Sequence, residues 1–283
     1  MDQREYTLAR GSFPDRPATL RPLTVRRFGA VNWVGLGTLY VKEVQRFAKL
    51  WGQTVLAPVI TTLLYLAVFT LALGGAGRHV GAVPYLEFLG PGLVMMAVVQ
   101  NAFSNTASSI LISKVQGNIV DVLMPPLTAG EFTFGYAMSG ATRGIFVSIV
   151  VALSMLPFVS LPFAHVWAIV IFGVLTSLLF SLFGLLAGLW AEKFDHMAAI
   201  ANFVITPLAF LSGTFYSVDQ LPPVWRAISR ADPLFLAIDG FRYGFIGQAE
   251  APVLTGALVL AALTAALWTL CLSLVHRGYK LKA

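Results

Sequence analysis

The sequence predicts an all-α polytopic membrane protein with six transmembrane helices, an N-terminal interfacial amphipathic helix and a re-entrant extracytoplasmic hairpin before the last span. Hydrophobic residues make up 57% of the 283 positions and charged residues 11%, whereas soluble proteins average about 25% charged residues. The charges gather before Thr54, at the C-terminal end and in short connections, so long uncharged stretches lie between them. Lipid is therefore the expected solvent for most of the chain.

Six segments are long enough to cross the hydrocarbon core, which takes about 20 predominantly apolar residues. The predicted spans are residues 54–74, 88–112, 132–156, 166–190, 197–216 and 252–275. The fifth span is short and carries Pro207 near its centre. We therefore expect this span to kink or break at the proline.

Lysine and arginine positions orient the spans, because short cytoplasmic loops are enriched in these residues. With the N-terminus inside, the outer side receives Arg78, Arg226, Arg230 and Arg242. The cytoplasmic side receives Arg4, Arg10, Arg16, Arg21, Arg26, Arg27, Lys42, Arg46, Lys49, Lys114, Lys193, Arg277, Lys280 and Lys282. Four or eight spans would also place both termini in the cytoplasm, but the segments found favour six.

The N-terminal region divides into a tail and a helix. Residues 1–30 contain prolines among arginines and predict a flexible basic cytoplasmic tail that is not a secretory signal peptide. Residues 31–53 predict an interfacial helix with a basic stripe of Lys42, Arg46 and Lys49. That helix either anchors the chain or acts as a lever on the first span. Residues 276–283 predict a second basic cytoplasmic tail.

No catalytic, cofactor-binding or metal-binding residue is expected in this chain, so we predict that it is not an enzyme. The sequence has no GxxxxGK[ST] loop, and its four histidines lie apart without an HExxH motif. The net charge of +6 lies beside membrane segments, where attraction to anionic lipid headgroups explains it better than nucleic-acid binding. The single cysteine, Cys271, excludes a disulfide within the chain.

Two polar features lie within predicted spans. In span two, polar residues cover one side of the helix at spacings of three, four and seven; these are Gln100, Asn101, Ser104, Asn105 and Ser108. In span three, Arg143 lies near mid-depth and must face the protein interior or a cavity. Either a structural hydrogen-bond network between the two spans or a transport pathway explains these residues. Small residues such as Gly135 and Gly140 in span three predict close helix packing.

The outer segment 217–251 contains two half-length amphipathic patterns, interrupted at Asp232 and Pro233. We predict a hairpin that dips into the outer leaflet, with Asp239 and Arg242 paired three residues apart on its polar side. On the cytoplasmic side, residues 114–124 predict a short helix ended by Pro125 and Pro126. This helix either docks onto a partner or makes a tight connection.

Several short motifs, in this order, resemble the signature of type-2 ABC exporter permeases. They are Met124-Pro125-Pro126-Leu127 with Glu131, Leu211-Ser212-Gly213-Thr214-Phe215-Tyr216, Leu221-Pro222-Pro223-Val224-Trp225, Ala231-Asp232-Pro233 and Asp239-Gly240-Phe241-Arg242-Tyr243-Gly244-Phe245. The resemblance implies a permease subunit of an ATP-driven exporter in the bacterial cell inner membrane. It also implies a homodimer in contact with membrane lipid and with a separate ABC ATPase subunit, which would bind ATP and Mg. The cargo is not implied, since members move drugs, polysaccharides and lipid-linked glycans.

The resemblance also assigns expected roles to residues. Contacts that couple the permease to the ATPase would involve Lys42, Arg46, Gly117, Asp121, Pro125 and Glu131. The pathway or its outer gate would involve Gln100, Asn101, Asn105, Arg143, Phe215, Tyr216, Trp225, Asp239 and Arg242. A stand-alone secondary transporter or channel is the alternative, but acidic or histidine relays and inverted repeats are not apparent. A membrane-embedded enzyme lacks paired catalytic residues at membrane depth.

Overall fold

The computed structural model describes residue 29 and residues 31–72 and 79–281. Contacts divide the chain into Met1–Val31 and Asn32–Ala283, and every helix and strand of the described residues belongs to the second unit. Apart from Gly29, the predicted tail 1–30 lies outside the described residues.

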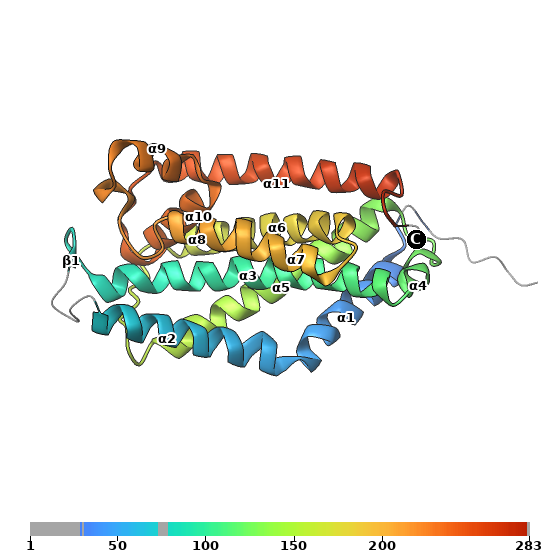
Figure 1. The fold of residues 1–283 in the computed structure, drawn as a ribbon, viewed down its shortest axis with the longest axis horizontal. Coiled ribbons are helices and arrows are strands. Elements are labelled where there is room, and N and C mark those ends of the chain that lie inside the picture. The colour runs from blue at the N-terminus through green and yellow to red at the C-terminus, as the bar shows by residue number, and fades with distance from the viewer. Residues whose placement is uncertain (1–28, 30, 73–78, 282–283) are drawn as a thin grey trace, which may run out of the picture. The chain divides into compact units, whose positions relative to one another are not determined.

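Helices dominate the described residues, and the strands form a single short hairpin of β1 (His79–Val80) and β2 (Val83–Pro84). Four helices lie toward the ends of the bundle, and we name these ends inner and outer after the orientation predicted from the sequence. The inner end has α1 (Trp33–Lys49) and α4 (Ile119–Leu123), and the outer end has α9 (Pro223–Ala231) and α10 (Pro233–Ile246) (Figure 1). The long helices are α2 (Ala57–Ala72), α3 (Tyr85–Val115), α5 (Ala129–Met155), α6 (Val166–Trp190), α7 (Phe194–Ile200) continued by α8 (Thr206–Leu211), and α11 (Val253–His276).

The prediction of six transmembrane helices is confirmed. The helices long and apolar enough to span a membrane are Gly52–Leu71, Tyr85–Val115, Ala129–Met155, Val166–Trp190, Phe194–Leu211 and Val253–His276. Their bounds differ from the predicted ones mainly in spans two and five. Span five begins three residues earlier than predicted and ends at Leu211, because residues from Ser212 onward form a turn.

The two ends of the unit carry different elements. Figure 1 shows α1, α4 and the C-terminal end together at one end, and β1 with α9 at the other. The predicted cytoplasmic helix over residues 114–124 is shorter than expected. Helix α3 runs through Val115, Gly117 then adopts a φ of 74°, which glycine tolerates best, and α4 covers only Ile119–Leu123.

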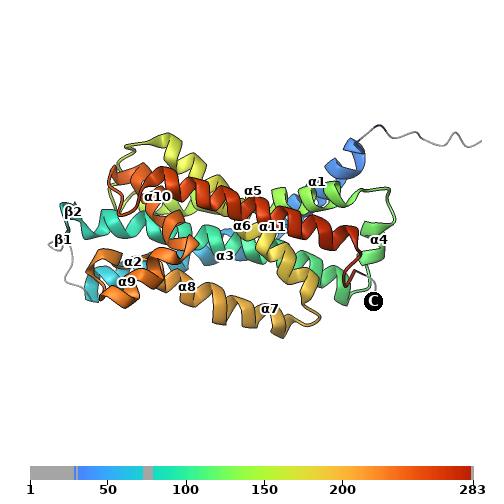
Figure 2. The same ribbon diagram turned by 90° about the horizontal axis from the view of Figure 1, so that it is seen from above.

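Helix α3 lies at the centre of the bundle and packs against α5, α6, α10 and α2. Within the apolar 18-residue stretch of each span, 83% of the residues of α3 are buried. The corresponding share is 17% in the spans of α2 and α11 and 11% in α7–α8. Figure 2 shows α7 and α8 at the edge of the bundle. Helices with few buried residues leave apolar surface for lipid or for another subunit.

Two spans contain a π-helical turn immediately before a proline. Gly52–Leu56 precedes Pro58 between α1 and α2, and Ala201–Ile205 precedes Pro207 between α7 and α8. A proline lacks the N–H that continues an α-helical ladder, and a π turn accommodates that loss. The irregularity predicted at Pro207 is thus a π turn, and a similar turn joins the first helix to span one.

The second half of the hairpin differs from the prediction. Helix α10 is not a lipid-facing half-helix, because it packs against α6, α11 and α3. Its apolar residues are almost fully buried, among them Leu234, Phe235, Ile238, Phe241 and Phe245. By contrast, α9 leaves Val224, Trp225 and Ile228 exposed. The two segments look equally amphipathic in the sequence, but tertiary packing buries α10 and leaves the apolar face of α9 exposed.

Glycine allows the close approach of α3, α5 and α6. A Cβ at Gly140 of α5 would overlap Ser181 Oγ of α6 and Thr106 Oγ1 of α3, two atoms that lie 2.8 Å apart and share a hydrogen bond. Small residues bring backbones together in membranes, where packing and hydrogen bonds replace the hydrophobic drive. The predicted packing role of Gly140 is confirmed.

Replacement of Gly140 by alanine should lower the free energy of unfolding by about 1–3 kcal/mol, because the added methyl group has to displace both hydroxyls. The apparent melting temperature of the purified protein in detergent measures this effect. Gly37→Ala is the control, since a Cβ at Gly37 of α1 meets no atom within 4 Å. Equal melting temperatures for the two variants would contradict the packing role of Gly140.

Candidate functional site

A polar cavity lies between α2, α3 and α5, with a volume of about 330 Å³. Three of the residues predicted for the pathway, Gln100, Asn101 and Arg143, belong to its wall. The other lining residues are Gln53, Ala57, Pro58, Thr61, Thr62, Tyr65, Leu93, Met96, Ala97 and Ser104. A polar cavity within apolar spans is an arrangement typical of a transport pathway.

Arg143 lies near the middle of α5 and is only 8% exposed. Its Nη2 donates to Asn101 Oδ1 at 3.1 Å, and its Nε is buried with no hydrogen-bond partner among the described residues. An arginine at the bilayer centre costs roughly 2.5–3.5 kcal/mol by insertion scales. A single bond to a neutral amide offsets part of that cost, and the polar cavity supplies room for water or a ligand to offset more.

Helix α2 contributes polar residues to the cavity that were not singled out from the sequence. They are Thr61 and Thr62, and the π turn before α2 adds Gln53. Ser104 of α3, part of the polar face predicted for span two, lines the same cavity. The adjacent threonines in an otherwise apolar span are the signal that marks this face of α2. Sequence spacing identifies a polar face on one helix, but the opposite wall comes from whichever helix packs against it.

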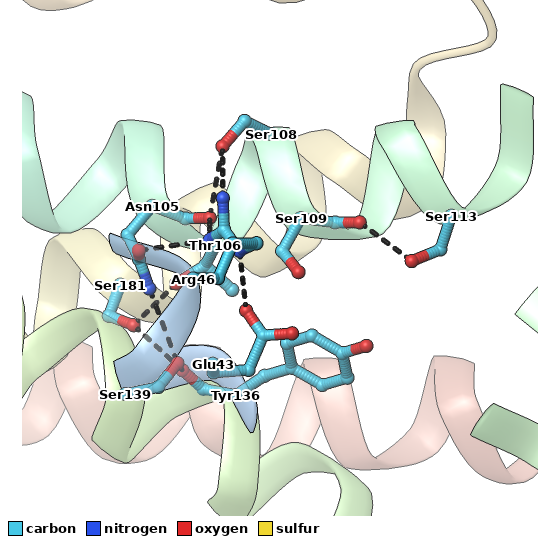
Figure 3. Close-up of polar contacts among 10 residues, drawn as sticks. All are labelled: Glu43, Arg46, Asn105, Thr106, Ser108, Ser109, Ser113, Tyr136, Ser139 and Ser181. Carbon is cyan, nitrogen blue, oxygen red and sulfur yellow. Dashed lines mark hydrogen bonds and ion pairs between the residues drawn. The ribbon is translucent and has the colours of Figure 1, made fainter. Parts of the chain in front are cut away.

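The polar side of α3 serves two sites and not one. Gln100, Asn101 and Ser104 face the cavity, whereas Asn105 and Ser108 contact Arg46 of α1 (Figure 3). Arg46 Nη2 donates to Asn105 O at 2.8 Å and to Asn105 Oδ1 at 2.9 Å. Asn105, predicted to border the pathway, therefore belongs to the contact between α1 and α3.

The predicted basic stripe on α1 is wrong for Arg46. Lys42 and Lys49 are exposed, but Arg46 turns into the bundle and forms an ion pair with Glu43 at 3.1 Å. Glu43 is 1% exposed, and its Oε1 has no hydrogen-bond partner among the described residues. A buried carboxylate needs a cation nearby. Arg46 therefore pairs with Glu43 inside the bundle and does not face the lipid surface with Lys42 and Lys49.

Further hydrogen bonds join the α1 contact to α5 and α6 (Figure 3). Asn105 Nδ2 donates to Ser139 Oγ of α5 at 3.3 Å, and Ser181 Oγ of α6 donates to Ala137 O at 2.9 Å. Figure 3 also shows the Tyr136 ring beside Glu43. A continuous polar network thus connects α1 with three helices of the bundle.

Aromatic rings cluster at the outer end of the cavity. The ring of Phe215 stacks on Phe69 at a centroid distance of 4.4 Å and on Phe210 at 4.9 Å. Tyr65, which also lines the cavity, meets Phe215 edge-on at 5.8 Å. Phe69 lies about one turn beyond Tyr65 on α2, so the cluster adjoins the cavity through Tyr65.

The predicted ion pair between Asp239 and Arg242 is wrong. Asp239 accepts hydrogen bonds from the backbone N–H groups of Glu250 and Ala251 at 2.9–3.1 Å. Burial raises the pKa of Asp239, and these backbone donors and the charge of Arg242 oppose that rise. The two side chains diverge because each one ties α10 to a different segment.

Arg242 anchors the turn that carries Phe215. Its Nη2 donates to Gly213 O at 2.9 Å and its Nε to Phe88 O at 3.2 Å, while the guanidinium lies 3.7 Å from the centroid of the Phe88 ring. Burial lowers the pKa of Arg242 to about 10. Arg242 is thus a structural link among α10, the start of α3 and the 212–216 turn.

Two other predicted gate residues lie outside the aromatic cluster. Tyr216 is half-buried and its OH donates to Leu211 O at 3.0 Å, whereas Trp225 lies on the exposed face of α9 and is 54% exposed. Of the predicted aromatic gate residues, Phe215 is the one that belongs to the aromatic cluster, and it meets the cavity wall through its contact with Tyr65.

At the inner end, α1 and α4 enclose a groove of about 230 Å³. It brings together three residues predicted to couple the permease to an ATPase: Lys42, Asp121 and Pro125. Gly117 lies exposed in the turn before α4.

Glu131, also predicted to couple the permease to an ATPase, lies elsewhere. It is buried and caps α5 through Thr128, and it also accepts a hydrogen bond from the backbone N–H of Asn32. Glu131 therefore joins the start of α1 to the start of α5.

Comparison with known proteins identifies the family. The ABC-2 type transporter family matches residues 35–246, which run from α1 to the end of α10. This chain belongs to that family. The permease is 41% identical over 253 residues to the inner membrane transport permease YadH of Escherichia coli strain K12, covering 89% of this chain and 98% of YadH. It is 28% identical over 239 residues to nodulation protein J of Rhizobium leguminosarum bv. viciae, covering 80% and 86%.

Membership of this family confirms the predicted function at the level of the subunit. The chain is a transmembrane permease subunit of an ABC transporter, a multi-pass protein of the inner membrane that works with an ABC ATPase subunit. The family match covers the cavity, the α1 contact with α3, the inner groove and the aromatic cluster. These features are therefore parts of a transporter domain.

Replacement of Arg46 by methionine should destabilise the permease strongly, because it leaves Glu43 buried without its cation. Removal of one partner of a buried pair costs about 3–5 kcal/mol, and we expect the lower end here since Arg46 is 21% exposed. The double variant Arg46→Met with Glu43→Leu should recover most of the loss. Melting temperatures in detergent for the two singles and the double variant test this, and a double variant less stable than both singles would contradict it.

Proposed function

We propose that this permease exports cargo through the polar cavity between α2, α3 and α5, powered by ATP hydrolysis on the partner subunit. The supporting observation is the continuous arrangement of inner groove, buried polar network, cavity and aromatic cluster along the bundle. Each neighbouring pair of these features shares a helix. A movement at the inner end thus has a direct physical route to the cavity.

The permease would supply no nucleotide site of its own. ATP and magnesium would bind to the ABC ATPase subunit, and the exposed side chains around the inner groove would contact that subunit. Lys42 and Asp121 provide charges of both signs there, and Pro125 stiffens the segment after α4. When ATP binding closes the partner, α1 would move, and its Arg46 contacts would shift α3 relative to α2 and α5.

A homodimer is the assembly that we propose. The spans of α2, α7–α8 and α11 bury few of their residues within one chain, and exposed aromatic side chains such as Phe203, 81% exposed, occur on them. Lipid and a second copy would divide this surface between them. Both termini would lie in the cytoplasm, since the C-terminal end and the start of α1 are at the end of the bundle where the inner groove lies.

The experiment that tests this function is affinity purification of the tagged permease in mild detergent, followed by an ATPase assay. We expect a nucleotide-binding subunit in stoichiometric amount, whose hydrolysis depends on the permease. Reproducible recovery of the permease alone in several detergents would refute the proposal.

Single cysteines locate the contact in the same complex. Cys271 is buried, so an introduced cysteine dominates labelling by a thiol cross-linker. Val120→Cys on α4 should cross-link to the ATPase, whereas Val224→Cys on α9 should not; both parent side chains are more than half exposed. Cross-linking from Val224→Cys alone would place the ATPase at the wrong end of the bundle.

A further inference from the structure

The charge of the cavity points to the chemistry of its ligand. Among the described residues that line it, Arg143 carries the one formal charge, and no aspartate or glutamate is present. The other polar groups are amides and hydroxyls, which are neutral at all ordinary pH values. The wall therefore has a net positive charge in a low-dielectric surrounding, where a charge acts strongly on a ligand.

The binding capacity of Arg143 is largely unused. Among the described residues, Arg143 has one hydrogen bond, to the neutral amide of Asn101, and its Nε has no partner. Glu43, the buried acid on the neighbouring helix, is already paired with Arg46. A guanidinium presents paired N–H donors that match the oxygens of a phosphate or carboxylate. An anionic group would satisfy donors that the permease leaves free.

Polarity changes along the cavity. On α3, Ser104, Asn101 and Gln100 lie toward the inner end, and the next lining residues toward the outer end are Ala97, Met96 and Leu93. Tyr65 and the aromatic cluster continue the apolar part. A ligand that matches this wall has a polar, anionic group at the inner half and an apolar group at the outer half.

The volume limits what the cavity encloses. Pockets for drug-sized ligands measure roughly 300–1,000 Å³, and about 330 Å³ lies at the lower end of that range. The cavity suits a headgroup with the first part of a chain, and longer chains would extend past α2 toward lipid. A cationic headgroup of the same size would face Arg143 without a counter-charge.

We propose that the cavity binds the anionic group of an amphipathic cargo, with Arg143 pairing with a phosphate or carboxylate and the adjacent amides and hydroxyls binding the polar groups beside it. This inference rests on the proposed function, because it names the class of cargo that the pathway takes. It assigns Arg143 a ligand-binding role.

Binding assays on the permease–ATPase complex in neutral phosphatidylcholine nanodiscs test the proposal. The probes are dioctanoyl phosphatidic acid, dioctanoylglycerol and inorganic phosphate. We expect phosphatidic acid to bind at least about tenfold more tightly than either of the others, since only it has both the anion and the apolar part. Equal binding of dioctanoylglycerol would overturn the anionic part of the proposal, and equal binding of inorganic phosphate would overturn the amphipathic part.

Two variants at one position test the charge without removing Arg143. Gln100 lines the cavity and is half-buried, so Gln100→Lys and Gln100→Glu place opposite charges at one point of the wall with similar side-chain length. Phosphatidic acid should bind about tenfold more tightly to the lysine variant and about tenfold more weakly to the glutamate variant, whereas dioctanoylglycerol, which has no charge, should bind equally to the two variants. Equal effects of the two variants would overturn the proposal.

ATPase activity separates this inference from the proposed function. If hydrolysis depends on the permease but the cavity shows no preference for anions, the cargo class is wrong and the transport function stands. If no ATPase accompanies the permease, the transport function fails, and binding to the permease alone still decides whether the cavity selects anions. Arg143→Gln should weaken phosphatidic acid binding at least about tenfold, and Arg143→Lys, which keeps the charge but loses the paired donors, should weaken it less.

Discussion

The burial of α3 over most of its surface is the constraint on which the rest of this structure depends. A helix at membrane depth that carries several amides and hydroxyls finds no hydrogen-bond partners in lipid, so other helices have to supply them. Asn101 pairs with Arg143 of α5, Asn105 with Arg46 of α1, and Thr106 with Ser181 of α6. The glycine at position 140 lets the last of these contacts form, because any larger residue would separate the helices.

The same constraint brings the cavity and the α1 contact close together. Asn101 and Asn105 are four residues apart on α3, about one helical turn, yet one contacts the arginine of the cavity and the other contacts the arginine of α1. A rigid helix transmits displacement over one turn with little loss. Under the proposed function, these bonds are the route by which a movement of α1 would reach α3.

The outer end is held by different interactions. Arg242 and Asp239 bind backbone groups of separate segments, and the 212–216 turn that Arg242 helps to position presents Phe215 to Phe69 and Tyr65. Gly92 lets this turn approach α3, since a Cβ there would lie 2.8 Å from Thr214 O. Backbone anchors fix the base of the turn, while its aromatic tip relies on ring contacts that are individually weak.

The sequence by itself determined the class of the protein, the number of spans, the irregularity at Pro207 and the motifs of the family. These follow from bilayer thickness, from the missing N–H of proline and from short local patterns, none of which requires knowledge of distant contacts. Only the tertiary structure decided which partner each polar residue takes. Spacing suggested that Asp239 pairs with Arg242 and that Arg46 shares a stripe with Lys42. In the structure Asp239 binds backbone N–H groups of Glu250 and Ala251, and Arg46 binds Asn105 of α3 as well as Glu43 of its own helix. Spacing describes one helix, whereas the partners of a buried polar group also lie on the helices and turns that pack against it.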